Sequence, residues 1–205
     1  GLGTGSTAAH AIHALGQAVD SGFDVRGIPT SFQSRQLALD AGIPLTSLDA
    51  VDGVDIAIDG ADQVAERGDG GFDLVKGGGA AHAREKIVDA AADRFVVVVD
   101  PSKLVDPLDY PVPVEVLPDA RPTVAGSVRA LGGEPTLRAA AHKDGPVVTD
   151  NGNVVLDCDF GPIGDPASLA TELSALPGVV EQGLFVGLAD AVHVGSTDGV
   201  DVRGE

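Results

Sequence analysis

Two of the chain's four lysines lie in the stretch KGGGAAHAREK, residues 76–86, on either side of three consecutive glycines. Glycines leave backbone N–H groups exposed, and such groups at the start of a helix stabilise a developing oxyanion. Lys76 would add a full positive charge there, and Glu85 follows early in the predicted helix. Because glutamate is ionised at neutral pH, this combination fits proton abstraction from carbon beside a carbonyl group. In the alternative, Glu85 and Lys86 belong to a solvated helix face, an interpretation that we prefer for Lys86 alone.

A second glycine loop, GLGTGST at residues 1–7, leads from the end of a predicted strand into a helix. The start of a helix binds phosphate through its unpaired N–H groups and its partial positive charge, and Thr4, Ser6 and Thr7 add hydroxyl donors. A dinucleotide motif would need glycine at position 6, and a Walker motif would need lysine in the loop. The alternative to a phosphate site is a tight turn with a capping serine. PTSFQS at residues 29–34 is a second hydroxyl-rich turn, which a simple helix cap would also explain.

Two aspartates lie in IDGAD, at the carboxyl end of an apolar stretch that is predicted to be a strand. Open α/β sheets bind ligands at this end of their strands, so Asp59 and Asp62 are placed to hold sugar hydroxyl groups. A turn cap is the alternative for Asp62, and a metal site is disfavoured because no histidine or third carboxylate follows at ligand spacing. Lys103, in DPSKLVD after another predicted strand, favours anion binding because lysine is so rare in this chain.

The elements that must position these residues alternate over the first half of the chain. Strands are predicted at residues 23–28, 54–62 and 94–100, and helices at residues 6–22, 31–42 and 80–92. Alternation of this kind predicts parallel strands joined by right-handed crossovers. Aromatic residues make up only 3% of the chain, so the core must consist of Val, Leu, Ile and Ala, which suits buried parallel strands.

The pattern changes at PVPVEVLPDARPTV, residues 111–124, where repeated proline predicts a domain boundary or an edge strand. A helix is predicted next, over residues 123–131, and Asn151-Gly152 between two β-branched stretches predicts a hairpin. A second helix, over residues 165–176, begins with an aspartate cap followed by proline.

These changes of pattern predict two domains. An α/β domain would consist of residues 1–113 and 183–205, and a smaller α+β domain would be inserted at residues 114–182. The chain is expected to return to the first domain because its last segment, GLFVGLADAVHVGSTDGVDV, again has the pattern of strands.

Charge and composition exclude several classes of protein. Asp and Glu outnumber Lys and Arg by 31 to 13, and the formal net charge of −18 argues against nucleic acid or an anionic membrane as a partner. The acidic residues are spread along the chain, which favours a solvated surface suited to high salt over an acidic interaction segment. The single cysteine, Cys158, excludes an internal disulfide and is predicted to be a buried, inert thiol. No apolar stretch approaches the ~20 residues of a membrane span and no signal peptide is visible, so we predict a cytoplasmic protein.

Taken together, the segments resemble the ribose-5-phosphate isomerase A family over nearly the whole chain. The resemblance rests on GTGST (3–7), DGAD (59–62), KGGGAA followed by REK (76–86), DPSKLVD (100–106), PVEV (113–116), VVTDNGNVVLD (147–157) and GLF (183–185), in the family's order. It implies an α/β fold: a Rossmann-like parallel-sheet domain with an inserted smaller α+β (ferredoxin-like) domain. It also implies an isomerase that interconverts D-ribose 5-phosphate and D-ribulose 5-phosphate through a cis-enediolate, in the non-oxidative branch of the pentose phosphate pathway, without metal or cofactor.

The resemblance further implies a role for each candidate residue. Glu85 would move the proton between C1 and C2, and Asp59, with Asp62 nearby, would act in ring opening and on protons of the sugar oxygens. The residues that would stabilise the enediolate are Lys76, Gly77, Gly78 and Gly79. The other substrate-binding residues would be Thr4, Gly5, Ser6, Thr7 and Lys103, with the loop hydroxyl groups on the phosphate.

The resemblance implies a homodimer or homotetramer that binds a pentose 5-phosphate. The family usually has a helix before the first strand, often with a lysine that reaches the substrate, and this chain opens without it, so we expect the natural chain to begin earlier. Two other functions remain open. A non-catalytic sugar-phosphate sensor would not need Glu85, and a CoA-transferase-like enzyme would form a glutamyl thioester.

Overall fold

The computed structural model describes residues 1–204 and shows a mixed α/β protein with two compact units. Unit 1 is formed by residues 1–61, 84–103 and 187 onward, and unit 2 by residues 62–83 and 104–186. All of the predicted insertion lies in unit 2, which also takes in neighbouring residues that the sequence-based division assigns to the first domain. The predicted domain boundaries themselves stay a prediction.

Unit 1 is built on a sheet in which three adjacent strands are parallel, as the alternating pattern predicts. In sheet order the strands are β1 (Ala57–Asp59), β4 (Phe95–Val99), β10 (Ala191–Ser196) and β11 (Gly199–Gly204), the last antiparallel to β10. Leu2 adds parallel bridges to Pro29 and to Ile58. The first glycine loop therefore leaves the sheet beside the carboxyl end of β1.

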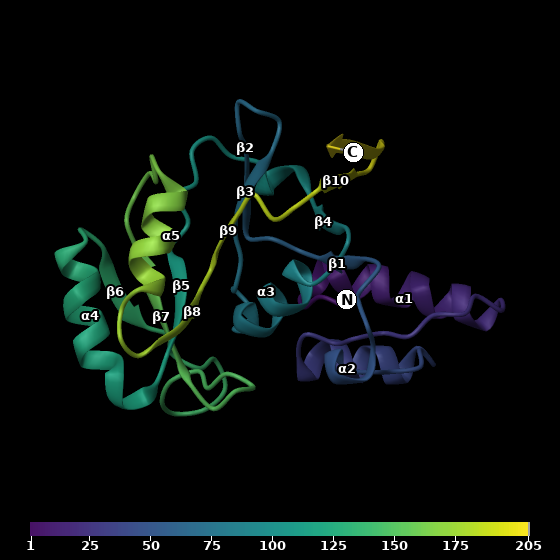
Figure 1. The fold of residues 1–205 in the computed structure, drawn as a ribbon, viewed down its shortest axis with the longest axis horizontal. Coiled ribbons are helices and arrows are strands. Elements are labelled where there is room, and N and C mark those ends of the chain that lie inside the picture. Colours follow the sequence, from purple (N-terminus) through teal and green to yellow (C-terminus); the bar gives the residue numbers. More distant parts are fainter. Residues whose placement is uncertain (205) are drawn as a thin grey trace. The chain divides into compact units, whose positions relative to one another are not determined.

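Helices α1 and α2 lie side by side in unit 1 (Figure 1). The helices that begin in the first hundred residues are α1 (Ser6–Asp20), α2 (Phe32–Asp40) and α3 (His82–Ala90), all close to their predicted positions. Ile12 of α1 and Ala38 of α2 pack together in a small apolar cluster. In residues 1–204, no helix has the length and apolar character needed to cross a bilayer.

The strand predicted at residues 23–28 is wrong. This segment forms only an isolated bridge, between Gly27 and Leu45, and Phe23 at its start is 58% exposed. Only Gly27 and Ile28 are buried, so the apolar residues of the segment do not alternate between a core and solvent. The apolar pattern alone could not reveal that Gly27 approaches the side chain of Leu2 so closely that a Cβ would lie 2.5 Å from it.

Unit 2 contains a complete β-α-β-β-α-β arrangement, which is the ferredoxin-like pattern. Its elements are β5 (Val112–Val116), α4 (Arg121–Ala130), β6 (Glu134–Leu137), β7 (Val154–Asp159), α5 (Pro166–Ser174) and β8 (Val179–Gln182). The strands form an antiparallel sheet in the order β6-β7-β5-β8. The predicted α+β insertion is thus confirmed as a fold, with both helices near their predicted positions.

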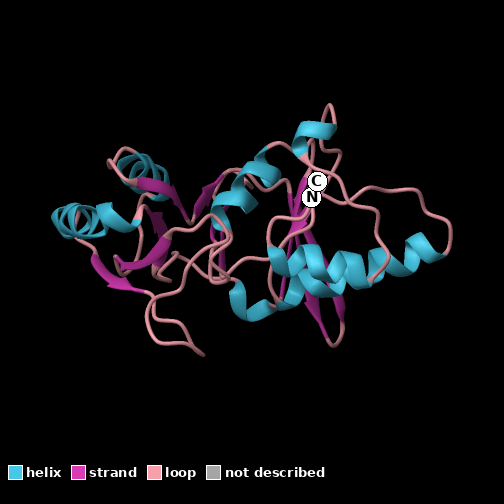
Figure 2. Ribbon diagram, turned by 90° about the horizontal axis from the view of Figure 1, so that it is seen from below, coloured by secondary structure: helices cyan, strands magenta, loops and turns pink. Residues whose placement is uncertain are grey.

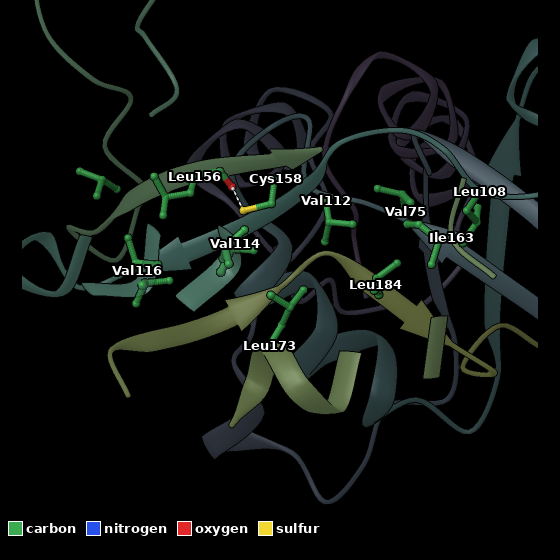
Figure 3. Close-up of a cluster of buried hydrophobic side chains, with 13 residues drawn as sticks. Val75, Leu108, Val112, Val114, Val116, Leu156, Cys158, Ile163, Leu173 and Leu184 are labelled. Carbon is green, nitrogen blue, oxygen red and sulfur yellow. Dashed lines mark hydrogen bonds between the residues drawn. The ribbon is translucent and has the colours of Figure 1, made fainter. Parts of the chain in front are cut away.

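The two faces of this sheet differ in character because successive side chains of a strand point to opposite faces. Val112, Val114 and Val116 of β5 lie in the main apolar cluster, with Leu156 and Cys158 of β7 (Figure 3). Helices α4 and α5 cover this face, as Figures 1 and 2 show from two directions. Intervening residues, such as Glu115 and Asp157, therefore belong to the opposite face.

The edge-strand alternative predicted for residues 111–124 is wrong for β5, which lies between β7 and β8 in the sheet. Proline is disfavoured inside a sheet because it cannot donate a hydrogen bond to a neighbouring strand. Pro113 is tolerated because β8 ends at Gln182, and the carbonyl oxygen of the next residue, Gly183, accepts the N–H of Lys76 at 2.8 Å and so needs no N–H from position 113.

A third, antiparallel sheet leads into the lysine and glycine loop. It consists of β2 (Gln63–Glu66), β3 (Phe72–Val75) and β9 (Leu184–Val186), in that order. The remaining helical turns are η1 (Leu48–Ala50), η2 (Pro101–Lys103) and η3 (Pro118–Ala120). The hairpin turn predicted at Asn151-Gly152 is confirmed, since Gly152 has a φ of 84° and donates to the carbonyl oxygen of Thr149. Its first arm forms only isolated bridges.

The thiol of Cys158 should be unreactive in the folded protein. It is completely buried, and this burial raises its pKa to about 12, so the nucleophilic thiolate is scarce at neutral pH. Labelling with Ellman's reagent should be at least about 100-fold slower in buffer than in denaturant, because access requires opening of the structure. Equal labelling rates under the two conditions would contradict the burial of this side chain.

Candidate active site

In unit 1, the carboxylate of Asp59 is held by backbone amides at the end of β1. The side chain is fully buried, and its Oδ1 accepts hydrogen bonds from the N–H of Thr4 at 2.9 Å and of Gly60 at 2.7 Å. Two donors on one oxygen fix the orientation of the carboxylate relative to the first glycine loop. The structure thus brings together Thr4 and Asp59, which the sequence places 55 residues apart.

Gly3 is required for this arrangement. A Cβ at this position would lie 2.0 Å from Oδ1 of Asp59 and 2.6 Å from the Cα of Asp59. Glycine therefore serves here to let two segments of backbone approach each other, and the loop needs it whether or not a ligand is bound.

The hydroxyl group of Thr4 connects the two hydroxyl-rich turns of unit 1. It donates to Oγ of Ser31 at 2.7 Å and lies 3.0 Å from Oγ1 of Thr30. Ser31 is also the N-cap of α2, where its Oγ accepts the N–H of Ser34 and a capping box is formed. The simple helix cap expected as an alternative for residues 29–34 is therefore confirmed.

The start of α1 lacks a side-chain cap. Its N-cap residue is Gly5, with a φ of 103°, and the N–H of Gly5 itself donates to Oε1 of Gln33 at 3.0 Å. Ser6 is exposed and Thr7 is partly buried at the first turn. Glycine offers no side-chain oxygen to accept the first helical N–H groups, so the capping serine considered above is not present and these donors are available to a ligand.

Glu85 lies in the first turn of α3, and its side chain is only 3% exposed. The alternative in which Glu85 belongs to a solvated helix face is therefore wrong, because a buried carboxylate needs a specific environment. Lys86, for which we prefer that alternative, is partly buried.

Lys103 ends the helical turn η2, where it donates its backbone N–H to the carbonyl oxygen of Asp100 at 3.1 Å.

In unit 2, Lys76 follows β3 directly and is only 2% exposed. Its backbone N–H donates to the carbonyl oxygen of Gly183, and its ammonium group lies 5.3 Å from the centre of the Phe185 ring. A cation at this distance from an aromatic face is stabilised, which partly offsets the loss of water around the charge. β3 and β9 therefore determine where the backbone of Lys76 and its ammonium group lie.

The glycine loop after Lys76 is fixed by Asp62. Oδ2 of Asp62 accepts the N–H of Gly78 at 2.7 Å, and Asp62 donates its own N–H to the carbonyl oxygen of Val75 at 2.8 Å. A Cβ at Gly78 would lie 2.5 Å from Oδ1 of Asp62, and a Cβ at Gly77 would lie 2.7 Å from Nδ1 of His82. Asp62 thus caps a turn that is distant in sequence, and the N–H of Gly78 is already used by this carboxylate.

Sequence reasoning missed Arg138, which donates to the carbonyl oxygens of Gly77 and Gly78 and pairs with Asp157. Nothing in the sequence distinguishes this arginine from the others. Asp157, by contrast, lies in the stretch VVTDNGNVVLD, which is one of the segments on which the family resemblance rests.

In residues 1–204, no group of three or more His, Cys, Asp and Glu side chains is arranged to hold a metal ion.

Residues 26–199 match the model of a family described as ribose 5-phosphate isomerase A (phosphoriboisomerase A). The chain belongs to this family. Ribose-5-phosphate isomerase A of Haloarcula marismortui is 70% identical over 203 residues, which are 99% of this chain and 86% of that protein. The enzyme of that name from Natronomonas pharaonis is also 70% identical, over 99% of this chain and 88% of that protein.

Solved structures of isomerase A proteins have the same fold. Ribose 5-phosphate isomerase A from Methanocaldococcus jannaschii superposes with a TM-score of 0.93 at 47% identity, over 100% of this chain and 89% of that chain. A D-ribose-5-phosphate isomerase in complex with phospho-erythronic acid gives a TM-score of 0.94 at 44% identity, with the same coverage of both chains. The family resemblance and the fold class are confirmed by these comparisons.

Replacing Gly3 by alanine should destabilise this isomerase A family member. The added Cβ must displace the carboxylate of Asp59 or the loop, so the free energy of unfolding should fall by about 1–3 kcal/mol. Denaturant titration at one fixed protein concentration measures this change. Gly53→Ala is the matched control, since a Cβ there meets nothing within 4 Å. Equal stability of the two variants would contradict the close approach of Gly3 and Asp59.

Proposed function

We propose that this protein is an aldose-ketose isomerase that interconverts D-ribose 5-phosphate and D-ribulose 5-phosphate through a cis-enediolate. Membership of the isomerase A family supports this function. The observation in the structure that carries it is the burial of Glu85 in the first turn of α3. A glutamate whose only role was to solvate a surface helix would be exposed. The glycine loop that precedes α3 in the sequence, with buried Lys76 at its start, supplies donors for a negatively charged intermediate.

The proposed reaction is one proton moved between adjacent carbons. In the open-chain aldose, the carboxylate of Glu85 takes the proton from C2, and the electron pair of the C–H bond forms the C1–C2 double bond of the enediolate. Negative charge then lies on the sugar oxygens, and Lys76 stabilises it. Transfer of the proton from Glu85 to C1, while the proton of the C2 hydroxyl passes to O1, gives the ketose with a carbonyl group at C2 and a hydroxyl group at C1. Asp59, whose carboxylate is fixed by two amide donors, transfers protons to and from the sugar hydroxyl groups and assists ring opening.

We assign the phosphate to the first loop. Uncapped N–H groups at the start of α1, together with the hydroxyl groups of Ser6 and Thr7, form a set of donors suited to an anion. Thr4 has a structural role as well as its proposed role in substrate binding, because its N–H donates to Asp59 and its hydroxyl group donates to Ser31. Lys103 is a further residue that we propose to bind the substrate.

A related solved structure supports a sugar-phosphate chain as the ligand. The D-ribose-5-phosphate isomerase with a TM-score of 0.94 was solved in complex with phospho-erythronic acid, whose planar carboxylate resembles the two oxygens of a cis-enediolate. The sugar-phosphate sensor would need no buried Glu85, which disfavours that alternative. The CoA-transferase alternative receives no support from the comparisons. A homodimer or homotetramer and a cytoplasmic location remain part of this proposal.

The purified protein should convert ribose 5-phosphate to ribulose 5-phosphate after exhaustive treatment with EDTA, at the same rate as before. The mechanism above uses only protein groups to move protons, so removal of divalent ions removes nothing from it. Ribulose 5-phosphate can be followed by its absorbance, with the untreated protein as control. Loss of activity on chelation, restored by a divalent metal, would contradict this mechanism.

Glu85→Gln should lower kcat by roughly 10²–10⁴-fold and leave KM nearly unchanged, because an amide cannot take the proton but retains the size of the side chain. The control is Glu172→Gln, a change at an exposed glutamate of α5 that should leave kcat unaltered. A Glu85→Gln variant that turns over at the wild-type rate would remove this residue from the reaction.

A further inference from the structure

We propose that Arg138, held by Asp157, is a positioning residue that fixes the peptide groups of the 77–79 glycine loop so that the N–H of Gly79 faces the enediolate. This inference rests on the function proposed above and adds to it a residue outside the substrate-contacting set. It is carried by contacts within unit 2, at the polar face of the β6-β7-β5-β8 sheet.

Arg138 contacts two successive carbonyl groups of the loop. Its Nη1 donates to the carbonyl oxygen of Gly77 at 2.8 Å and to that of Gly78 at 3.1 Å. The peptide group between Gly77 and Gly78 is also held at its other end, because the N–H of Gly78 donates to Asp62 at 2.7 Å. One peptide plane is therefore fixed from both sides by two charged groups.

The second contact determines the direction of the next amide. In a trans peptide group the C=O and N–H bonds point in opposite directions, so an oxygen of Gly78 turned toward Arg138 turns the N–H of Gly79 away from it. Among residues 1–204, no hydrogen bond from the N–H of Gly79 is found. Of the two amides inside the glycine run, that of Gly79 is thus the one left for a ligand.

A loop of three glycines needs such a restraint. Glycine occupies regions of backbone conformation on both sides of φ = 0 at similar energy, so its peptide groups can rotate at little cost. Gly77 has a φ of 107°, and Ala80 after the run has a φ of 58°. If the peptide group between Gly78 and Gly79 turned over, a carbonyl oxygen would replace the N–H, and it would repel the negative charge of the enediolate.

Arg138 is itself held rigidly. Its Nε donates to Oδ2 of Asp157 at 2.9 Å and its Nη2 pairs with Oδ1, so the two planar groups meet side by side. The side chains are only 14% and 29% exposed. The backbone N–H of Arg138 donates to the carbonyl oxygen of Val155, and its carbonyl oxygen accepts the N–H of Val147. Because the ion pair has no net charge, its effect on the loop is one of geometry and not of added positive potential.

Three variants test this role: Arg138→Lys, Arg138→Ala and Asp157→Asn, each compared with wild type and with Arg129→Lys. Arg129 is an exposed arginine of α4 whose ion pair with Glu134 is 3.5 Å long, so its replacement is a matched control. Lysine keeps the charge at position 138 but cannot contact two carbonyl oxygens and a carboxylate at once. We expect kcat for ribose 5-phosphate to fall by about 10–100-fold in each of the three, which is less than or equal to the loss of one oxyanion donor.

Binding measurements separate a positioning role from a merely structural one. The affinity for phospho-erythronic acid, whose carboxylate stands in for the enediolate, should fall in parallel with kcat. The affinity for inorganic phosphate and the midpoint of thermal unfolding of Arg138→Lys should stay at wild-type values. Guanidinium ion at low millimolar concentration should restore part of the kcat of Arg138→Ala, whereas an equal concentration of sodium should not.

The outcomes distinguish failure of this inference from failure of the proposed function. A wild-type protein that does not isomerise ribose 5-phosphate refutes the function, and the inference with it. A wild-type protein that is active, beside an Arg138→Lys variant with unaltered kcat, refutes the inference alone. The inference is also refuted if kcat, phosphate affinity and thermal stability all fall together in Arg138→Lys. Should Arg138→Ala fail to fold, Arg138→Lys and Asp157→Asn decide the question.

Discussion

Asp59 and Asp62 each accept a backbone N–H from a glycine-containing loop, and the proposed chemistry depends on these two contacts. A Cβ at Gly3 or at Gly78 would overlap the carboxylate that it faces. The glycines are therefore needed to let the backbone approach these carboxylates, in addition to any amides that they offer to a ligand. Such contacts fix a loop without extended secondary structure, because a charged acceptor strengthens an amide hydrogen bond and a buried charge is costly to leave unsatisfied.

The two faces of the β6-β7-β5-β8 sheet have different roles, because successive side chains of a strand point to opposite faces. One face buries Val114 and its neighbours against α4 and α5 and holds the unit together. The other face carries Glu115, which is fully buried and accepts hydrogen bonds from the side chains of Thr149, Asn151 and Asn153. A buried carboxylate with three side-chain donors ties the 149–153 turn to β5. Arg138, which directly follows β6, donates to the glycine loop and is paired with Asp157 of β7. The sheet thus anchors the arginine that contacts a loop of flexible composition.

The charge of the chain bears on how it binds an anion. A protein with a net charge of −18 repels a sugar phosphate at low ionic strength, whereas 1 M salt reduces the reach of that repulsion to roughly 3 Å. Local donors must then supply the attraction, and amide groups at the start of α1 with a few buried or semi-buried lysines fit that need. The relative from the halophile Haloarcula marismortui agrees with a surface suited to high salt.

The sequence by itself determined the family, helices α1 to α5, the ferredoxin-like insertion and the residues proposed for catalysis, because glycine runs, capping residues and strand ends are local patterns. Tertiary structure alone decided that Glu85 is buried, that β5 is an interior strand, and that residues 23–28 do not form a ladder. It also decided that the N–H of Gly78 belongs to Asp62 and that Arg138 reaches the loop from 60 residues away. The physical reason is the same in each case: burial and the partner of a hydrogen bond depend on which distant segments pack together, and no local pattern of residues contains that information.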